Sequence, residues 1–146
     1  MEHLGRDAEL ICRTKVMQRL KNVCQLGNIR GTDLESSNRF DHCVGTARLA
    51  RIMAQALLDK HPTRLTPRDV LRVEIAGLMH DAGHGPLSHT YDYQFVRDDV
   101  PKTGDEVKDA WRDHEMRSVA MVPIAVAQVK GFLADEDDEI HFGDEH

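Results

Sequence analysis

The residue types that could do chemistry gather around an adjacent histidine–aspartate pair. His80 and Asp81 end an apolar segment, and His42 lies upstream, near the start of another. Imidazole and carboxylate groups together can hold a divalent transition metal ion. At the end of a helix both side chains of the pair can reach one ion, and His42 can join them from a neighbouring helix. We therefore predict a metal centre formed by His42, His80 and Asp81.

A plainer interpretation of the same residues is structural. His42 alone would be a surface histidine, and His80 with Asp81 would be a turn at a helix end. However, a carboxylate buried at the end of an apolar helix is costly without a cation or a hydrogen-bond donor. The combination therefore favours a paired or metal-bound carboxylate at Asp81.

A dense polar stretch, GHGPLSHTYD, follows the pair at residues 83–92. Its glycines would let the backbone approach a ligand closely. His84 and His89 could donate protons, and Asp92 could orient one of them. Alone, such a stretch is more often a loop than an active site. Beside a metal ion, which can activate water and polarise a phosphoryl oxygen, it predicts the wall of a phosphate pocket. The chemistry indicated is hydrolysis of a phosphoester or phosphoanhydride.

The elements that must position these residues are predicted to be helices. The apolar spacing predicts one over residues 8–26, broken near Thr14, and an amphipathic one over residues 40–60. A third runs from a Thr-Pro start at Thr66 to about Ala82, where the threonine caps it. It is apolar on most sides, which is typical of a central, buried helix.

The rest of the chain is predicted to alternate loops and short helices. Residues 28–38 and 97–108 have loop composition, and residues 88–95 suggest a short helix. A further helix restarts over residues 113–121, and Pro123 should end or kink it. Without an internal repeat or an alternating strand pattern, the fold class is all-α.

Length and charge indicate one domain with an acidic end. The 146 residues suit a single domain, residues 1–134, followed by a tail, residues 135–146, with seven acids and no base. The net charge of -6 thus belongs to the tail, because residues 1–134 hold 19 basic and 18 acidic residues. The near-neutral charge of residues 1–134 argues against nucleic-acid binding.

We expect a soluble, intracellular protein, since the sequence has neither 18 consecutive apolar residues nor an apolar leader. Three cysteines are expected to be free thiols.

These motifs resemble those of the HD-domain phosphohydrolases. The similarity lies in His42 and in the setting of HDAGHGPLSH at residues 80–89. The segments NRFDH at residues 38–42, MQRLKNVCQLG at residues 17–27 and Asp-His-Glu at residues 113–115 are similar more narrowly to the deoxynucleoside triphosphate (dNTP) triphosphohydrolase branch that also carries a SAM domain. A bare His-Asp pair is common by chance, whereas the longer motif is specific.

The resemblance implies an all-α HD-domain helical bundle, abbreviated at the C-terminus. It implies hydrolysis of a dNTP, dGTP included, to deoxynucleoside and triphosphate, with water attacking the α-phosphate. It also implies a divalent metal ion (Fe, Mn, Zn or Mg) and a homo-oligomer as a possible assembly. The implied roles are phosphate contact by His84, proton donation by His89, support by Asp92 and His114, α-phosphate binding by Arg39, and sugar and base packing by Gln25 and Leu26.

Two departures from the family pattern leave alternatives open. A fourth metal ligand, an aspartate on a later helix, has no counterpart in this sequence apart from the acidic run, residues 135–138, which suits a solvated tail better. Arg13 stands where an acidic residue reads an activating guanine nucleotide, so guanine-specific activation is not expected. The alternatives are another HD nucleotidase or phosphodiesterase, or an inactive HD fragment that binds a nucleotide or a partner.

Overall fold

The computed structural model describes residues 4–27, 37–96, 101–106, 109 and 111–141, with side chains through residue 135. Within these ranges the protein is helical, and an antiparallel bridge between Cys24 and Asn38 is the one extended pairing. The predicted all-α class is confirmed. Much of the loops predicted at residues 28–38 and 97–108 lies outside the described residues.

A break at Thr14 divides the first helical segment, as predicted. α1 (Arg6–Arg13) ends there because the backbone of Thr14 is extended. The Thr14 hydroxyl donates to the carbonyl oxygen of Ile11 at 2.7 Å and accepts from the amide of Met17 at 3.4 Å. It thus caps α2 (Lys15–Gln18), which continues into η1 (Arg19–Asn22). The helical segment ends at Asn22, four residues earlier than expected.

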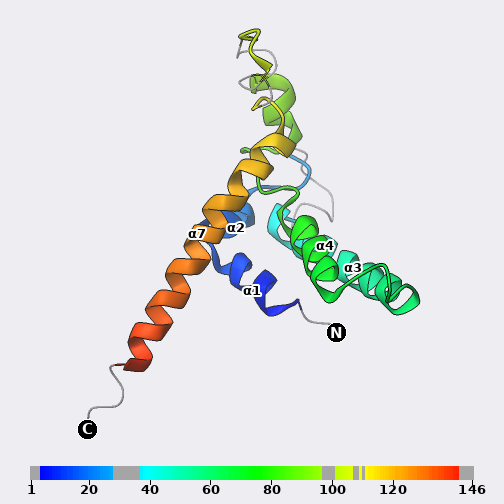
Figure 1. The fold of residues 1–146 in the computed structure, drawn as a ribbon. Coiled ribbons are helices and arrows are strands. Elements are labelled where there is room, and N and C mark those ends of the chain that lie inside the picture. The colour runs from blue at the N-terminus through cyan, green and yellow to red at the C-terminus, as the bar shows by residue number, and fades with distance from the viewer. Residues whose placement is uncertain (1–3, 28–36, 97–100, 107–108, 110, 142–146) are drawn as a thin grey trace.

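Two long helices, α3 (Arg39–Lys60) and α4 (Pro67–Met79), lie side by side as a hairpin (Figure 1). The predicted start of α4 is confirmed, since Thr66 and Asp69 form a reciprocal capping box. Near the end of α4, Gly77 touches α3 so closely that a Cβ there would lie 3.2 Å from the Cβ of Ala50. This close approach brings the first turns of α3 beside the last turn of α4.

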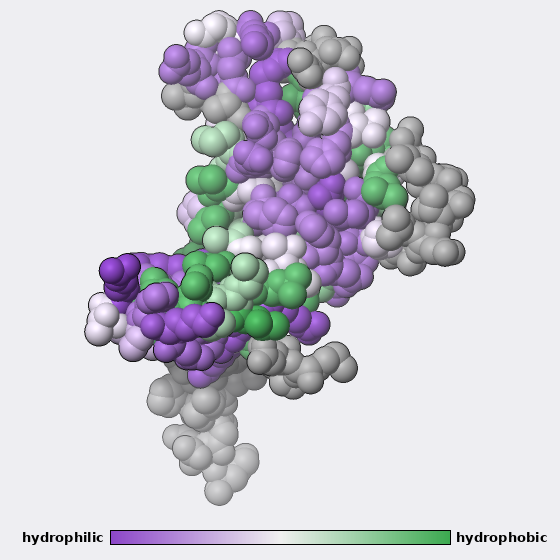
Figure 2. All heavy atoms as spheres, turned by 90° about the vertical axis from the view of Figure 1, so that its right-hand side faces the viewer, coloured by the Kyte–Doolittle hydropathy of each residue, from purple (hydrophilic) through white to green (hydrophobic). Residues whose placement is uncertain are grey.

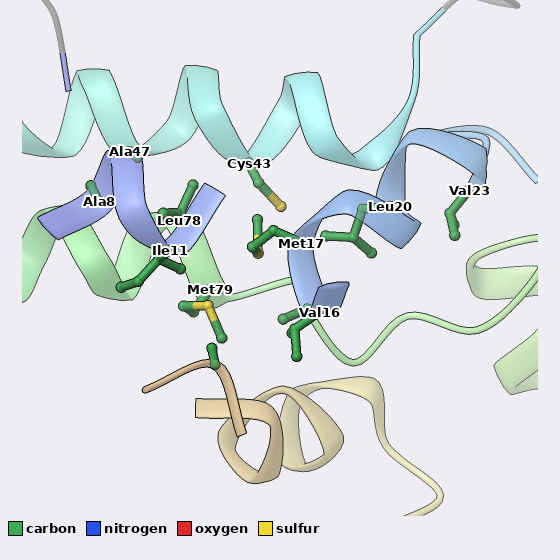
Figure 3. Packing of buried hydrophobic residues seen from close by; sticks show 12 residues of the cluster. Ala8, Ile11, Val16, Met17, Leu20, Val23, Cys43, Ala47, Leu78 and Met79 are labelled. Carbon is green, nitrogen blue, oxygen red and sulfur yellow. The ribbon is translucent and has the colours of Figure 1, made fainter. Parts of the chain in front are cut away.

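The buried core lies where the N-terminal helices meet the start of α3 and the end of α4 (Figure 3). α7 (His114–His141) closes it with Ala125. The core therefore includes the residues on either side of the His-Asp pair, Met79 and Ala82. Its members are Ala8, Ile11, Val16, Met17, Leu20, Val23, Cys43, Ala47, Leu78, Met79, Ala82 and Ala125.

The prediction that α4 is buried on most sides is wrong. Val73 is 45% exposed, and on the amphipathic helix α3 the apolar residues Met53 and Leu57 are exposed as well. The reason is that α3 and α4 cover one another along one side, while the remaining helices reach only the end near the His-Asp pair (Figure 1). In the view from the side toward which this hairpin points, the upper surface is mainly hydrophilic, and most of the apolar side chains lie lower, beside polar ones (Figure 2).

We predicted that Pro123 ends or kinks the helix, and α7 runs without interruption through it, so the first of these two outcomes is wrong. Proline removes the hydrogen bond to the carbonyl of the residue four positions earlier, Val119. Both Val119 and Pro123 are exposed, so water can reach that carbonyl. The helix also continues to His141, seven residues into the predicted acidic tail.

The continuity of α7 bears on the expectation, drawn from the sequence, that the chain has no membrane-spanning segment. Because apolar residues on both sides of Pro123 fall in one helix, residues His114–Asp135 form a segment long and apolar enough to cross a membrane by length and composition. The same segment supplies Ala125 and Met121 to the protein core. Length and composition therefore do not distinguish a membrane helix from a core helix here.

Candidate metal centre and adjoining histidine cluster

The side chains of His42, His80 and Asp81 converge on one point. His42 lies in the first turn of α3, and the pair directly follows α4. Nε2 of His42 lies 3.2 Å from Nε2 of His80, and Oδ2 of Asp81 lies 3.4 and 3.3 Å from these two nitrogens. The fold thus brings the predicted metal ligands together.

The ring of His80 is turned so that a lone pair faces this point. Its Nδ1 lies 2.8 Å from the carbonyl oxygen of Gly77. Since a carbonyl oxygen only accepts, Nδ1 carries the proton and Nε2 of the neutral ring is free to bind a metal ion. For His42, burial lowers the pKa and outweighs the opposing effect of Asp81, so its neutral form is favoured too.

The separations between the three ligand atoms fit one bound ion. With bonds of about 2.1 Å in a tetrahedral arrangement, ligand atoms lie about 3.4 Å apart. The separations here are 3.2 to 3.4 Å. Two imidazole nitrogens with one carboxylate oxygen are ligands that Zn, Fe and Mn accept. The residues therefore fit a divalent metal ion.

Arg39, predicted to contact phosphate, is buried and donates to three groups of the protein. Nη1 donates to Oδ2 of Asp81 at 2.6 Å, Nε to Oγ of Ser88 at 2.9 Å, and Nη2 to the carbonyl oxygen of Gln25 at 3.2 Å. Its guanidinium thus joins the metal centre to the segment predicted to hold the sugar. These bonds use three of the five N–H donors of Arg39, so two remain for a phosphate.

Asp81 is an ionised carboxylate despite its burial. Burial itself opposes ionisation, but His84, His80 and Arg39 outweigh it and hold the pKa of Asp81 well below its usual range. Asp81 also links two clusters, because its Oδ1 lies 3.4 Å from Nε2 of His84 while Oδ2 faces His42.

A second cluster, His84, His89, Asp92 and His114, lies beside the first. The rings of His84 and His114 are stacked, with centroids 3.9 Å apart, and His89 meets both edge-on. Nδ1 of His114 lies 3.0 Å from Oδ2 of Asp92, whose other oxygen is paired with Arg117. Every residue predicted for acid–base work or its support is thus in this cluster, from the loop after α4, from η3 (Tyr91–Val96) and from α7.

Gln25 and Leu26 lie next to the loop that carries the histidines. Both are half-buried, and Gly27 after them packs so closely that a Cβ there would lie 2.7 Å from the carbonyl oxygen of Leu87. Oε1 of Gln25 is buried and has no hydrogen-bond partner among the described residues. A hydroxyl donor on a ligand would satisfy it.

Two arginines that reasoning from the sequence did not single out hold the histidine loop in place. Arg19 donates to the carbonyl oxygens of Ala82 and His84, and Arg117 donates to that of Gly83 at 2.9 Å. Neither belongs to the His-Asp motif. Arg19 stood inside the segment that resembled the family, which was the one signal for it.

Gly83 and Ser88 have structural roles in the same loop. A Cβ on Gly83 would overlap the backbone of α7 at His114, and the Gly83 amide donates to Oγ of Ser118 at 2.7 Å. Ser88 has a left-handed backbone, with φ 52°, uncommon outside glycine. Its hydroxyl accepts from Arg39 and donates to the carbonyl oxygen of Cys24 at 2.7 Å, and these two contacts hold the conformation.

A mostly apolar cavity of about 400 Å³ opens next to the metal centre, between the end of α4 and the start of α7. His80, Asp81 and Glu115 are among the residues that line it. Among the described acidic residues of α7, Glu115 is therefore the one that faces this cavity. Asp135 is exposed, and the side chains of residues 136–138 lie outside the described part, so the expectation that the acidic run is a solvated tail and supplies no fourth ligand stays a prediction.

The chain belongs to the HD-domain family, and its all-α fold is consistent with that family. The family's HD domain matches residues 39–125, which span both clusters from α3 to the middle of α7. The resemblance inferred from the motifs is thereby confirmed.

Among known proteins the chain is similar to the deoxynucleoside triphosphate triphosphohydrolases SAMHD1. It is 42% identical over 113 residues to that of Danio rerio, 40% over 116 residues to that of Mus musculus, and 37% over 135 residues to that of Homo sapiens. These alignments cover 74%, 76% and 87% of this chain. The chain spans 16 to 21% of the length of these relatives, within their HD region.

Proposed function

We propose that this chain is a metal-dependent dNTP triphosphohydrolase domain. The observation that carries the proposal is the pair of adjoining clusters, in which three ligand atoms lie 3.2 to 3.4 Å apart and Asp81 also contacts His84 of the second cluster. A phosphoryl group between the clusters would meet a metal ion on one side and proton donors on the other. The relatives' shared name, deoxynucleoside triphosphate triphosphohydrolase, supports dNTPs as substrates.

In the proposed reaction, water attacks the α-phosphorus and the bond to the 5′ oxygen breaks. A divalent ion at His42, His80 and Asp81 supplies activation of water and polarisation of a phosphoryl oxygen. His89, which is exposed, donates a proton to the departing 5′ oxygen. The products are a deoxynucleoside and inorganic triphosphate.

The remaining residues hold the reacting groups. Asp92 fixes the ring of His114 through the 3.0 Å contact, and His114 stacks on His84, which contacts a phosphate oxygen. The unpartnered Oε1 of Gln25 accepts from a sugar hydroxyl, and Leu26 packs on the base. Arg39 binds the α-phosphate through the N–H donors that its three protein contacts leave over.

Incubation of the purified chain with Mn²⁺ and each dNTP in ¹⁸O-labelled water tests the proposal. We expect deoxynucleoside and triphosphate as products, with the label in the triphosphate, because water bonds to the α-phosphorus. Release of pyrophosphate or monophosphate would instead assign the chain to another HD nucleotidase or phosphodiesterase. Matching ribonucleotides test whether the pocket selects the sugar.

Two histidine variants serve as a matched pair. His80→Ala removes a metal ligand and should abolish turnover. His61→Ala removes an exposed histidine just after α3, outside both clusters, and should leave turnover unchanged. Equal turnover in the two variants would contradict the proposed metal centre.

One observation favours a second candidate, an HD domain that binds a nucleotide or a partner without turnover. α7 exposes apolar side chains to which a partner could bind, among them Met116, Val119 and Val126. Nucleotide binding without product release, in a chain that holds its metal ion, would support this candidate.

A further inference from the structure

The side chain of Arg117 contacts three segments around the second cluster. Arg117 lies about one helical turn after His114 on α7, and its side chain is 14% exposed. Nε donates to the carbonyl oxygen of Gly83 at 2.9 Å, Nη1 donates to that of Trp111 at 2.9 Å, and Nη2 pairs with Oδ1 of Asp92. These partners belong to the loop after α4, to the turn before α7 and to η3.

Two of these bonds anchor the guanidinium, so that the third is directed at Asp92. A guanidinium is planar, and its N–H donors point in fixed directions. Because Nε and Nη1 are bound to backbone carbonyl oxygens, the direction of Nη2 is set as well. The side chain of Asp92 is 8% exposed, so little water competes with Arg117 for its oxygens. Arg117 therefore fixes the rotation of the Asp92 carboxylate.

The second oxygen of Asp92 is thereby held beside two stacked histidines. Oδ2 lies 3.0 Å from Nδ1 of His114 and 3.9 Å from Nδ1 of His84. An ionised carboxylate only accepts, so Nδ1 of the neutral His114 ring carries the proton and Nε2 keeps its lone pair. The ring of His114 in turn stacks on that of His84, with centroids 3.9 Å apart. The position of Asp92 thus sets both the tautomer of His114 and the placement of His84.

We propose that Arg117 is a positioning residue, which acts through Asp92 on His114 and His84. Within the described part of the chain, none of its hydrogen bonds is to a residue of the metal centre. The consequence for turnover rests on the proposed function, in which His84 contacts a phosphate oxygen. The tautomer of His114 does not depend on that function.

The tautomer of His114 tests the inference without any nucleotide. In protein labelled with ¹⁵N-histidine, the ring nitrogen shifts are measured at a pH at which imidazole is neutral, and loss of a signal in His114→Gln assigns it. We expect the Nδ1–H form in the wild type and a shift toward the Nε2–H form in Arg117→Gln. Arg72→Gln breaks an exposed Arg–Asp pair on α4 and should keep the wild-type tautomer. An unchanged tautomer in Arg117→Gln would overturn the proposal.

A double-variant cycle on turnover shows whether Arg117 acts through Asp92. Arg117→Gln should lower kcat about 10²-fold, the order of effect that a displaced group near the reacting atoms has. KM should change little, since Arg117 does not contact the nucleotide in the proposed arrangement. Asp92→Asn should have a similar effect, and the two together should lower kcat no further than either alone. Additive effects, or an effect on KM alone, would show that Arg117 does not position Asp92.

A lysine variant separates positioning from charge and from folding. Arg117→Gln leaves a buried carboxylate without its cation, which destabilises the fold. Arg117→Lys keeps the positive charge but lacks the planar fork that binds the carbonyl oxygens of Gly83 and Trp111. Its circular dichroism spectrum should match the wild type, whereas its His114 tautomer and kcat should resemble those of Arg117→Gln. Wild-type tautomer and kcat in Arg117→Lys would show that charge alone is sufficient and would overturn the proposal.

Failure of the proposed function and failure of the positioning role give different results. Absence of triphosphate release from the wild type contradicts the enzymatic proposal, and the tautomer of His114 then still decides the role of Arg117. A wild-type tautomer in Arg117→Gln contradicts the positioning role, even where the wild type releases triphosphate.

Discussion

Arg39 donates to Asp81 at 2.6 Å through Oδ2, the same carboxylate oxygen that faces His42 and His80. A buried arginine and a metal ion would therefore share one ligand oxygen. The guanidinium compensates the buried carboxylate when the ion is absent, and an ion at the two histidines would take over part of that role.

This sharing predicts the behaviour of Arg39→Gln. Removing the arginine leaves Asp81 buried without its cation, which should destabilise the fold by about 3–5 kcal/mol. Added Mn²⁺ should recover part of this loss, so the rise in melting temperature on adding Mn²⁺ should be larger in Arg39→Gln than in the wild type. Differential scanning fluorimetry measures both shifts. Equal shifts would show that Arg39 and the ion do not share Asp81.

Metal removal should destabilise the chain through the His42–His80–Asp81 centre. Binding to the folded state alone adds about 2.7 kcal/mol when the ion is at 100 times its dissociation constant. We expect a chelator to lower the melting temperature of the wild type and of His61→Ala. His42→Ala should start lower and respond less. A full chelator response in His42→Ala would place the stabilising ion elsewhere.

Gly83→Ala should disrupt the contact between the histidine loop and α7. A Cβ there would overlap backbone atoms of His114 and Ser118, which cannot rotate away. Overpacking of this kind costs about 1–3 kcal/mol, measurable by urea unfolding. Gly45→Ala is the matched control in the interior of α3, where a Cβ meets nothing within 4 Å. It should stabilise the protein by about 0.5–1 kcal/mol.

Cys12 should react slowly with alkylating reagents in the folded state. Burial, assisted by Glu9, raises the pKa of its thiol from 9.0 to about 11. Because the folded pKa lies above the unfolded one, the contribution of Cys12 to stability is complete below about pH 9 and is lost as pH rises through about 11. Mass spectrometry of iodoacetamide labelling against pH measures the folded pKa, and labelling in urea supplies the reference. A midpoint near 9.0 in the folded protein would contradict the burial of this thiol.

Local sequence patterns were sufficient for those helix boundaries that depend on near neighbours in the sequence. Thr14 breaks the first helical segment and Thr66 begins α4, because each acts through hydrogen bonds to residues at most three positions away. The exposure of Val73 and the passage of α7 through Pro123 were not predictable in this way. Both depend on which neighbouring helices cover a given face.

In the candidate site, too, some residues were predictable from the sequence and others depend on the tertiary structure. Residue types and spacing named His42, His80 and Asp81, since metal chemistry restricts ligands to a few side chains. Arg19 and Arg117 were not predicted, because they donate to carbonyl oxygens more than 30 positions away. Every residue has a backbone carbonyl, so the sequence does not indicate which one an arginine will contact. The shared oxygen of Asp81 and the stacking of His84 on His114 arise only when α3, α4 and α7 pack together, because distances between side chains remote in sequence are set by helix packing.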